Sequence, residues 1–280
     1  MHLIPPEILA YAPVFVVVLA RVGGLFLLTP LLSSSVLPMR FRALLAIAFS
    51  AAVFPLVGAE QAAGLEIDIV LLLPMVATEA LVGLTIGVLA SIPLYSVQLG
   101  GKLMGQQMGL GIAQQVDPNA DIEGDNLGQI LFVVAIGTFL MLGGMNLVFA
   151  GLIESFRRVP VGMLAGETPP VDVLVGLVTS GYGLAIRIAM PVIAIIFVEN
   201  LLVGYLMKTV PSMNIMNFGF PIKITIGLIA VIGAIGAIGV AIGAEVMQAL
   251  EVTEAWVLEL GGPGGGLEPA SGVETDGVDG

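Results

Sequence analysis

Three charged residues stand alone within long apolar stretches, and they are the first candidates for chemistry: Arg21, Glu79 and Arg187. Charges inside a membrane are costly and usually face protein or water. They can relay protons or bind a charged substrate, or they can form structural ion pairs or reach the interface from a helix end. A proton relay needs several carboxylates or histidines in a row, and acidic residues are sparse here. We therefore favour a buried, structural role for all three.

No arrangement of side chains typical of an enzyme is present. The 280 residues include no cysteine and a single histidine, His2, which excludes thiol chemistry and nearly excludes a histidine-based catalytic or zinc site. A loop with Asp117, Asp121, Glu123 and Asp125 could bind a cation. Its spacing lacks the glycine and the distal glutamate of a calcium loop, so we interpret it as a solvated acidic loop. We expect no enzymatic activity, no cofactor and no metal.

The segment 100–119 is the most unusual part of the chain. Its four glutamines would carry unpaired amides into hydrocarbon, which is costly, yet its apolar residues are too numerous for a solvated loop. Its five glycines let the backbone bend and pack closely. We predict that this segment lies against other protein or inside a protein-lined passage, as part of a pore or gate.

The composition indicates an integral membrane protein. The chain is 58% hydrophobic and only 11% charged, with a mean hydropathy of +1.07, whereas soluble domains contain about 25% charged residues. The net charge of −12 is uneven, because residues 251–280 hold seven acidic and no basic side chains. We expect this Gly-rich acidic tail to be disordered after about residue 261. No basic residue precedes the first apolar run, so we expect that run to be retained rather than cleaved as a signal peptide.

Six apolar stretches predict an all-α membrane protein. A helix needs about 20 residues to cross a bilayer. The second stretch is short for this, whereas the third is about 46 Å long at about 1.5 Å per residue. Pro74 and Pro93 predict that the third stretch is kinked or split. The stretches are 8–29, 43–59, 69–99, 127–153, 173–199 and 224–250.

Basic residues between the stretches predict the orientation of the chain. Arg157 and Arg158 break the pattern, because they follow the fourth stretch on the side expected to be outside. Either one stretch does not span the membrane, or the chain departs from the rule. The residues that alternate correctly for a cytoplasmic face are Arg40, Arg42, Lys102, Lys208 and Lys223.

Small residues are spaced for close helix packing in lipid. The last apolar stretch is rich in glycine and alanine, so part of its surface is smooth, without bulky side chains. Two interpretations of these residues stay open: packing within the chain, and contact with another subunit. The glycines concerned are Gly83, Gly87, Gly233, Gly236, Gly239 and Gly243.

Short motifs with a specific order and spacing run through the chain. They are Ala20–Phe26, Val36–Arg42, Glu79–Gly83, Gly105–Pro118, Leu127–Gln129, Glu154–Arg157 and Val210–Lys223. Together they resemble the FliR family of the flagellar type III export gate, and the resemblance runs from about residue 8 to 250. Injectisome counterparts share the pattern, so the flagellar system is a preference between the two.

This resemblance implies a fold and a set of partners. It implies a FliP-like part at 1–172 with a pore loop at 100–126, a FliQ-like helical hairpin at 173–250 with its turn at 204–223, and the tail at 251–280. The expected function is to form, with several copies each of FliP and FliQ, the channel that passes unfolded flagellar proteins across the bacterial inner membrane at the basal body. FlhB is an expected partner and FlhA a further candidate, together with membrane lipid and no nucleic acid.

The resemblance also implies a role for the segment singled out above. In the family, the matching loop projects into the channel and helps to plug it. Our hypothesis is a seal that blocks ions and water at rest and yields to an unfolded substrate, with methionines as deformable filler. The residues assigned to it are Met104, Gln106, Gln107, Met108, Leu110, Ile112, Gln114, Gln115, Val116 and Asp117.

The alternative function is that of a secondary transporter or small-molecule channel. Breaks near Pro74, Pro93 and Pro191 and the lone charges fit it loosely. It predicts a self-sufficient fold, a midplane site and an internal repeat, and no repeat is visible between the two halves of the sequence.

Overall fold

The computed structural model describes residues 6–29, 32, 38–62, 69–110, 126–162, 171–209 and 215–260. Every regular element in these ranges is a helix, which confirms the predicted all-α class. The helices are α1 (Pro6–Leu28), α3 (Met39–Ala62), α4 (Ile69–Met108), α6 (Asn126–Met141), α7 (Gly144–Arg158), α8 (Val171–Thr209) and α9 (Ile215–Leu260).

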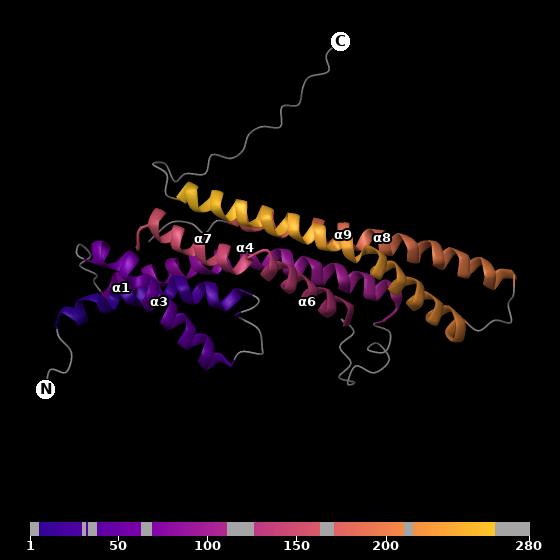
Figure 1. Ribbon diagram of the computed structural model, residues 1–280, viewed down its shortest axis with the longest axis horizontal. Coiled ribbons are helices and arrows are strands. Elements are labelled where there is room, and N and C mark those ends of the chain that lie inside the picture. The colour runs from indigo at the N-terminus through magenta and orange to yellow at the C-terminus, as the bar shows by residue number, and fades with distance from the viewer. Residues whose placement is uncertain are drawn as a thin grey trace, which may run out of the picture.

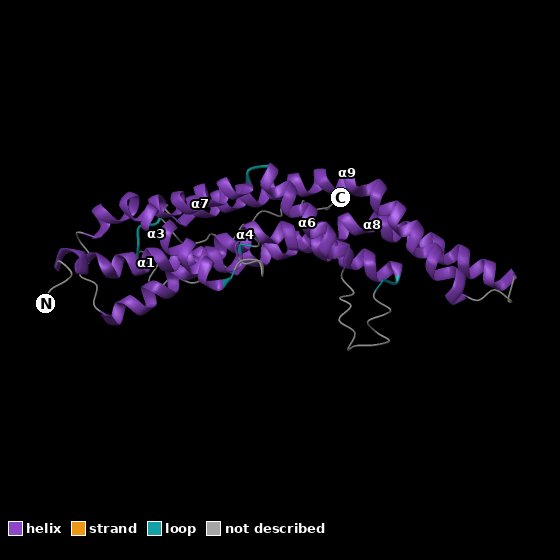
Figure 2. Ribbon diagram, turned by 60° about the horizontal axis from the view of Figure 1, so that its bottom comes forward, coloured by secondary structure: helices purple, strands orange, loops and turns teal. Residues whose placement is uncertain are grey.

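The molecule is elongated, and α4 forms its centre. Helix α4 contacts α1, α6, α7, α8 and α9. Helices α1 and α3 lie together at one end, whereas α8 and α9 run side by side along the molecule and extend beyond α6 at the other end (Figures 1 and 2). The hydrophobic core therefore follows α4 along its length.

Several helices are apolar enough to cross a membrane but are longer than a membrane is thick. Five are long and apolar enough to cross a bilayer, or up to six if the bent pair α6–α7 counts as one span. Helices α4, α8 and α9 contain 40, 39 and 46 residues, which corresponds to about 60 Å or more at about 1.5 Å per residue. The hydrocarbon core is about 30 Å thick. Large parts of these helices therefore lie outside hydrocarbon or against other protein.

The helix break lies in the fourth apolar stretch, whereas the sequence predicted it in the third. Helix α4 is one continuous element through Pro74 and Pro93, so it is not split. Packing explains this, because 67% of its apolar span is buried, and tertiary contacts override the local cost of a proline. The fourth stretch is broken instead, with a bend of 64° between α6 and α7. Gly143 adopts a φ of +72° at this point, which glycine tolerates far better than other residues.

Helices α8 and α9 form the predicted hairpin, but its turn is shorter than the 204–223 expected. Helix α8 continues to Thr209 and α9 begins at Ile215, so Pro221 lies inside α9 rather than in the turn. The Ser180 hydroxyl donates a hydrogen bond of 2.7 Å to Oε1 of Glu245, which fixes the register between the two helices. Helix α9 includes 251–260, and the expected disordered tail from 261 lies outside the described residues.

The end of α7 lies far from the turn of this hairpin (Figure 1). The basic pair at that end, Arg157 and Arg158, therefore stays opposite the lysines of the hairpin tip. Both arginines pair with Glu154, at 3.8 Å and 2.8 Å. Acidic residues contribute little to the orientation rule, so the departure of Arg157 and Arg158 from it remains.

Helices α1 and α4 approach each other closely at glycines. A Cβ atom added at Gly24 would overlap the carbonyl oxygen of Ala80, and one at Gly83 would overlap the carbonyl oxygen of Arg21. A Cβ at Gly87 would lie 3.1 Å from the carbonyl oxygen of Leu25. The sequence pattern of small residues thus marks a real helix crossing in α4, where backbone meets backbone.

We predict that Gly24→Ala destabilises the protein by about 1–3 kcal/mol, because the new methyl group must force α1 and α4 apart. The matched control is Gly23→Ala in the same turn, where a Cβ would meet nothing within 4 Å. That change should be neutral or stabilising by up to about 1 kcal/mol. Thermal unfolding in detergent measures both, and equal melting temperatures for the two variants would contradict the predicted crossing.

Candidate functional site

A fully enclosed ion pair connects α1 and α4. Arg21 is 0% exposed and Glu79 is 1% exposed. The Arg21 Nε donates a hydrogen bond to Oε2 of Glu79 at 2.5 Å. The guanidinium also lies over the ring of Phe156, 4.3 Å from its centroid. The sequence singled out both charges, and the structure brings them together.

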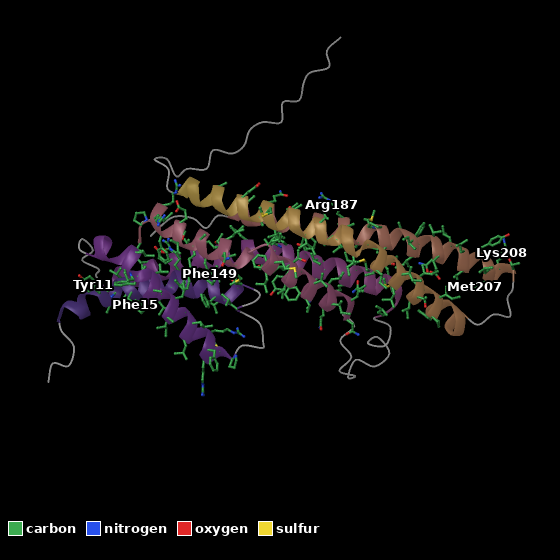
Figure 3. The ribbon with its side chains drawn as sticks, viewed as in Figure 1. Tyr11, Phe15, Phe149, Arg187, Met207 and Lys208 are labelled. Atoms are coloured by element: carbon green, nitrogen blue, oxygen red, sulfur yellow. The ribbon has the colours of Figure 1, made fainter. Side chains whose placement is uncertain are left out.

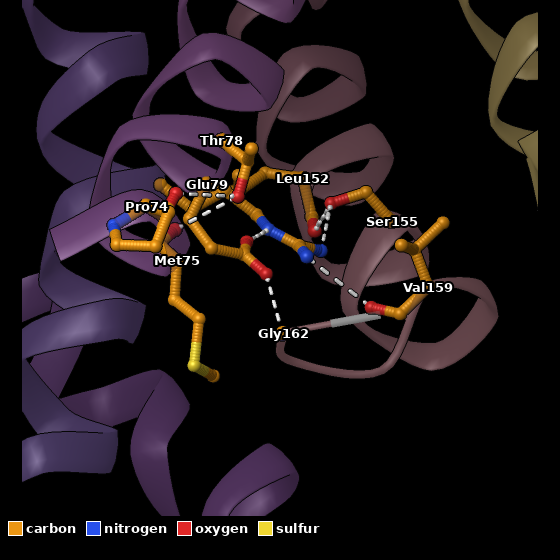
Figure 4. Close-up of polar contacts among 9 residues, drawn as sticks. Pro74, Met75, Thr78, Glu79, Leu152, Ser155, Val159 and Gly162 are labelled. Carbon is orange, nitrogen blue, oxygen red and sulfur yellow. Dashed lines mark hydrogen bonds and ion pairs between the residues drawn. The ribbon is translucent and has the colours of Figure 1, made fainter. Parts of the chain in front are cut away.

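The same pair holds α7 and the turn that follows it. Two other guanidinium nitrogens donate to the Ser155 hydroxyl at 3.3 Å and to the Val159 carbonyl at 3.2 Å. The second carboxylate oxygen of Glu79 accepts a hydrogen bond from the backbone N–H of Gly162 at 2.9 Å (Figure 4). Each charged group thus has protein partners on several sides. The arrangement connects α1, α4 and α7 and leaves no exposed face at which a substrate or proton donor could bind.

The third lone charge does not join this network. Arg187 lies on α8 and is exposed, so the expectation that it is buried within the chain is wrong. An apolar stretch of sequence does not reveal which face of a helix is covered, and α8 is covered on one face only.

Glu199 of α8 was not singled out from the sequence, where it ends the fifth apolar stretch. It is 5% exposed, and its buried Oε2 atom has no hydrogen-bond partner among the described residues. Its position inside the candidate span from Val178 to Thr209 was the available signal. A buried carboxylate without a partner is costly.

The segment predicted as a gate is partly helical. Residues 101–108 complete α4, and only Gly109 and Leu110 form a turn before the described chain stops. Met104 and Met108 are fully buried, whereas Gln106 and Gln107 are exposed. The methionines thus belong to the core, with Met108 packed against Gly227 of α9, and Leu110 is half-buried. The residues assigned to the gate that lie outside the described residues are Ile112, Gln114, Gln115, Val116 and Asp117.

The smooth part of α9 faces away from the rest of the chain. A Cβ added at Gly233, Gly236 or Gly239 would meet nothing within 4 Å, and only Gly243 has a neighbour, Leu142, at 3.7 Å. Of the two interpretations left open, packing within the chain does not apply to the first three glycines.

The whole hairpin is open in the same way. Only 28% of the apolar span of α8 and 22% of that of α9 are buried, against 67% for α4. The exposed surface of both helices is rich in large apolar side chains. Such a surface is expected to contact lipid or another protein.

Metal ligands do not gather in the described part of the chain, where no group of three or more His, Cys, Asp or Glu side chains could hold an ion. The acidic loop from Asp117 to Asp125 lies outside the described residues. The two main features of the described chain are therefore the Arg21–Glu79 ion pair and the exposed apolar surface of α8 and α9.

The fold defines a helical protein of the membrane-spanning class, and comparison with known proteins places it more closely. The sequence model of the bacterial export proteins, family 1, matches residues 12–249. The chain therefore belongs to this family of bacterial export proteins.

The curated proteins that this chain resembles are flagellar biosynthetic proteins named FliR. The chain is 28% identical to the flagellar biosynthetic protein FliR of Bacillus subtilis over 233 residues, which cover 82% of this chain and 89% of that protein. It is 28% identical to FliR of Aquifex aeolicus over 167 residues, 59% of this chain and 64% of that one. It is 29% identical to FliR of Escherichia coli over 136 residues, 48% and 51% of the two chains. The resemblance to the FliR family stated from the motifs is confirmed.

We predict that Glu79→Gln destabilises the protein by about 3–5 kcal/mol, because Arg21 is left as an uncompensated buried charge. The control is Glu154→Gln, which removes a partly exposed pair and should cost at most about 1 kcal/mol. A double change, Arg21→Met with Glu79→Leu, should recover much of the loss, because it removes both charges. Thermal unfolding in detergent ranks the three variants; a double variant less stable than Glu79→Gln would contradict a purely structural pair.

Proposed function

We propose that this protein is a subunit of the flagellar type III protein export gate. In this proposal it lies in the inner membrane at the flagellar basal body. With several copies of FliP and FliQ, it forms the channel through which unfolded flagellar proteins cross the membrane. FlhB binds this complex, with FlhA as a further candidate partner. The role is one in transport rather than catalysis.

The observation that carries this proposal is the match of the family of bacterial export proteins over residues 12–249, together with the name FliR borne by its relatives. The open hairpin supports it. A subunit of an assembled channel is expected to present large apolar surfaces to its neighbours, and α8 and α9 do so along most of their length. In the proposal, residues 1–172 correspond to a FliP-like part and 173–250 to a FliQ-like hairpin.

The rival function, a secondary transporter, finds less support. It requires a charged or polar site near the midplane that a substrate can reach. The Arg21–Glu79 pair is enclosed on all sides and leaves no room for a ligand. The two basic residues of α8, Arg187 and Lys208, are exposed and so lie outside any enclosed site formed by the described residues.

Because α4 continues to Met108, the proposed seal is narrowed to the residues that follow this helix. The buried side chains of Met104 and Met108 anchor the last turn of α4 in the core, while Gln106 and Gln107 are exposed. The gate segment therefore begins at an anchored helix end. We propose that residues 111–117 provide the yielding part of the seal and that the two exposed glutamines hydrogen-bond to neighbouring subunits.

Native mass spectrometry of the tagged chain, extracted from its own bacterial membranes, tests the proposed function. The expected result is a large complex with several copies of two smaller helical membrane proteins. A stable, folded monomer or simple homodimer would reject the export gate and favour the transporter.

For the seal, we predict that deletion of residues 111–116 raises ion leakage across membranes that contain the assembled complex. The deletion begins after Leu110 because Met108 is part of the core. The control is a deletion of equal length in the tail, residues 263–268, which should leave conductance unchanged. Conductance measured on reconstituted complexes decides the matter, and equal leakage from both deletions would argue against a seal.

A further inference from the structure

Arg187 is an exposed cation on an apolar helix face. It lies nine residues beyond Val178, the first residue of the candidate span of α8, and further from the other end at Thr209. Nine residues correspond to roughly 14 Å along a helix. The side chain lies at the outer edge of the hairpin, whereas Lys208 lies at its far tip (Figure 3).

Within the described residues, no ion pair balances the charge of Arg187. No hydrogen bond of Arg187 occurs within this part of the chain either. The nearby side chains of Tyr182, Ile186 and Met190 on α8 are large, mostly apolar and exposed. An unbalanced cation in such a setting is costly in hydrocarbon and is expected to have a partner.

The length of this face favours protein over lipid as its cover. Large exposed apolar side chains occur on α8 from Val175 to Leu206, a length of about 47 Å at about 1.5 Å per residue. The hydrocarbon core is about 30 Å thick. Lipid tails alone would leave a substantial part of this apolar face in water, so another protein must cover at least that part.

The hairpin surface beside Arg187 is formed in part by glycines, which carry no bulky side chains. The hydrogen bond between Ser180 and Glu245 fixes the antiparallel register. Seven residues on from Ser180, Arg187 is level with residue 238, between Gly236 and Gly239. Both glycines, like Gly183 one turn before Arg187 on α8, have open space beside them. A partner helix could therefore approach the backbone closely at this level.

We propose that the face of α8 around Arg187 binds an apolar helix of a partner subunit, and that this helix brings an aspartate or glutamate side chain to the guanidinium. A carboxylate is the natural partner because its two oxygens match the planar fork of arginine. The identification of the partner as another subunit of the export complex rests on the proposed function.

The test compares two charge reversals in the full-length chain, expressed with its native partners. Arg187→Glu should reduce the amount of co-purifying partner subunits at least about tenfold, because two carboxylates would then face each other in a desolvated contact. Lys208→Glu makes the same change in charge at the exposed tip and should leave the complex within about twofold of wild type. Arg187→Met removes the charge while keeping an apolar side chain, so it covers the case in which the reversed charge prevents folding. It should also weaken the complex if a partner carboxylate is left unpaired, whereas it should be harmless if Arg187 faces lipid.

A photo-crosslinking residue at Met190, which leaves Arg187 in place, identifies the occupant. The expected crosslink is to a helix of another subunit, and reversal of its nearby carboxylate to arginine should restore the complex of Arg187→Glu. Crosslinks to lipid alone, or wild-type composition of both Arg187 variants, would overturn the inference. A wild-type chain that purifies without partners would instead reject the proposed function itself.

Discussion

The close crossing of α1 and α4 is the constraint on which the rest of the structure depends. Gly24 and Gly83 let the two backbones meet, and the charges lie one turn away from them: Arg21 precedes Gly24 by three residues and Glu79 precedes Gly83 by four. The guanidinium and the carboxylate meet beside this close backbone contact. Because the pair also binds α7 and the turn after it, small residues on two helices determine the position of a third.

The sequence predicted much of this part of the fold. Apolar stretches located the helices, and the isolated charges located the ion pair. It could not predict that the pair would capture Ser155, Val159 and Gly162. Those contacts follow the bend at Gly143, whereas the prolines of α4 predicted a break elsewhere. A proline weakens a helix by a known local amount, but the packing that keeps α4 one continuous helix arises from helices distant in sequence.

The start of the gate segment and Arg187 lie in settings that the sequence did not reveal, for a related reason. Met104 and Met108 are four residues apart, the spacing of one helical face, and this pattern could have predicted that α4 continues. The glycines of the segment suggested a loop. Gly101 instead makes a close helix contact: a Cβ there would lie 2.7 Å from the Cα of Gly128 on α6. For Arg187, hydropathy identified the apolar helix correctly but carried no information on which face is covered.

The two parts of the molecule therefore treat charge in opposite ways. In the part built from α1, α4 and α7, the two buried charges, Arg21 and Glu79, balance each other inside the chain. In the hairpin, Arg187 is exposed and the buried Glu199 has no hydrogen bond to any described residue. A lone chain with such a hairpin bears the cost of both unbalanced charges and of a long apolar surface. Assembly removes these costs only if partners supply opposite charges at matching levels, and this requirement would make the hairpin selective for the right neighbours rather than generally adhesive.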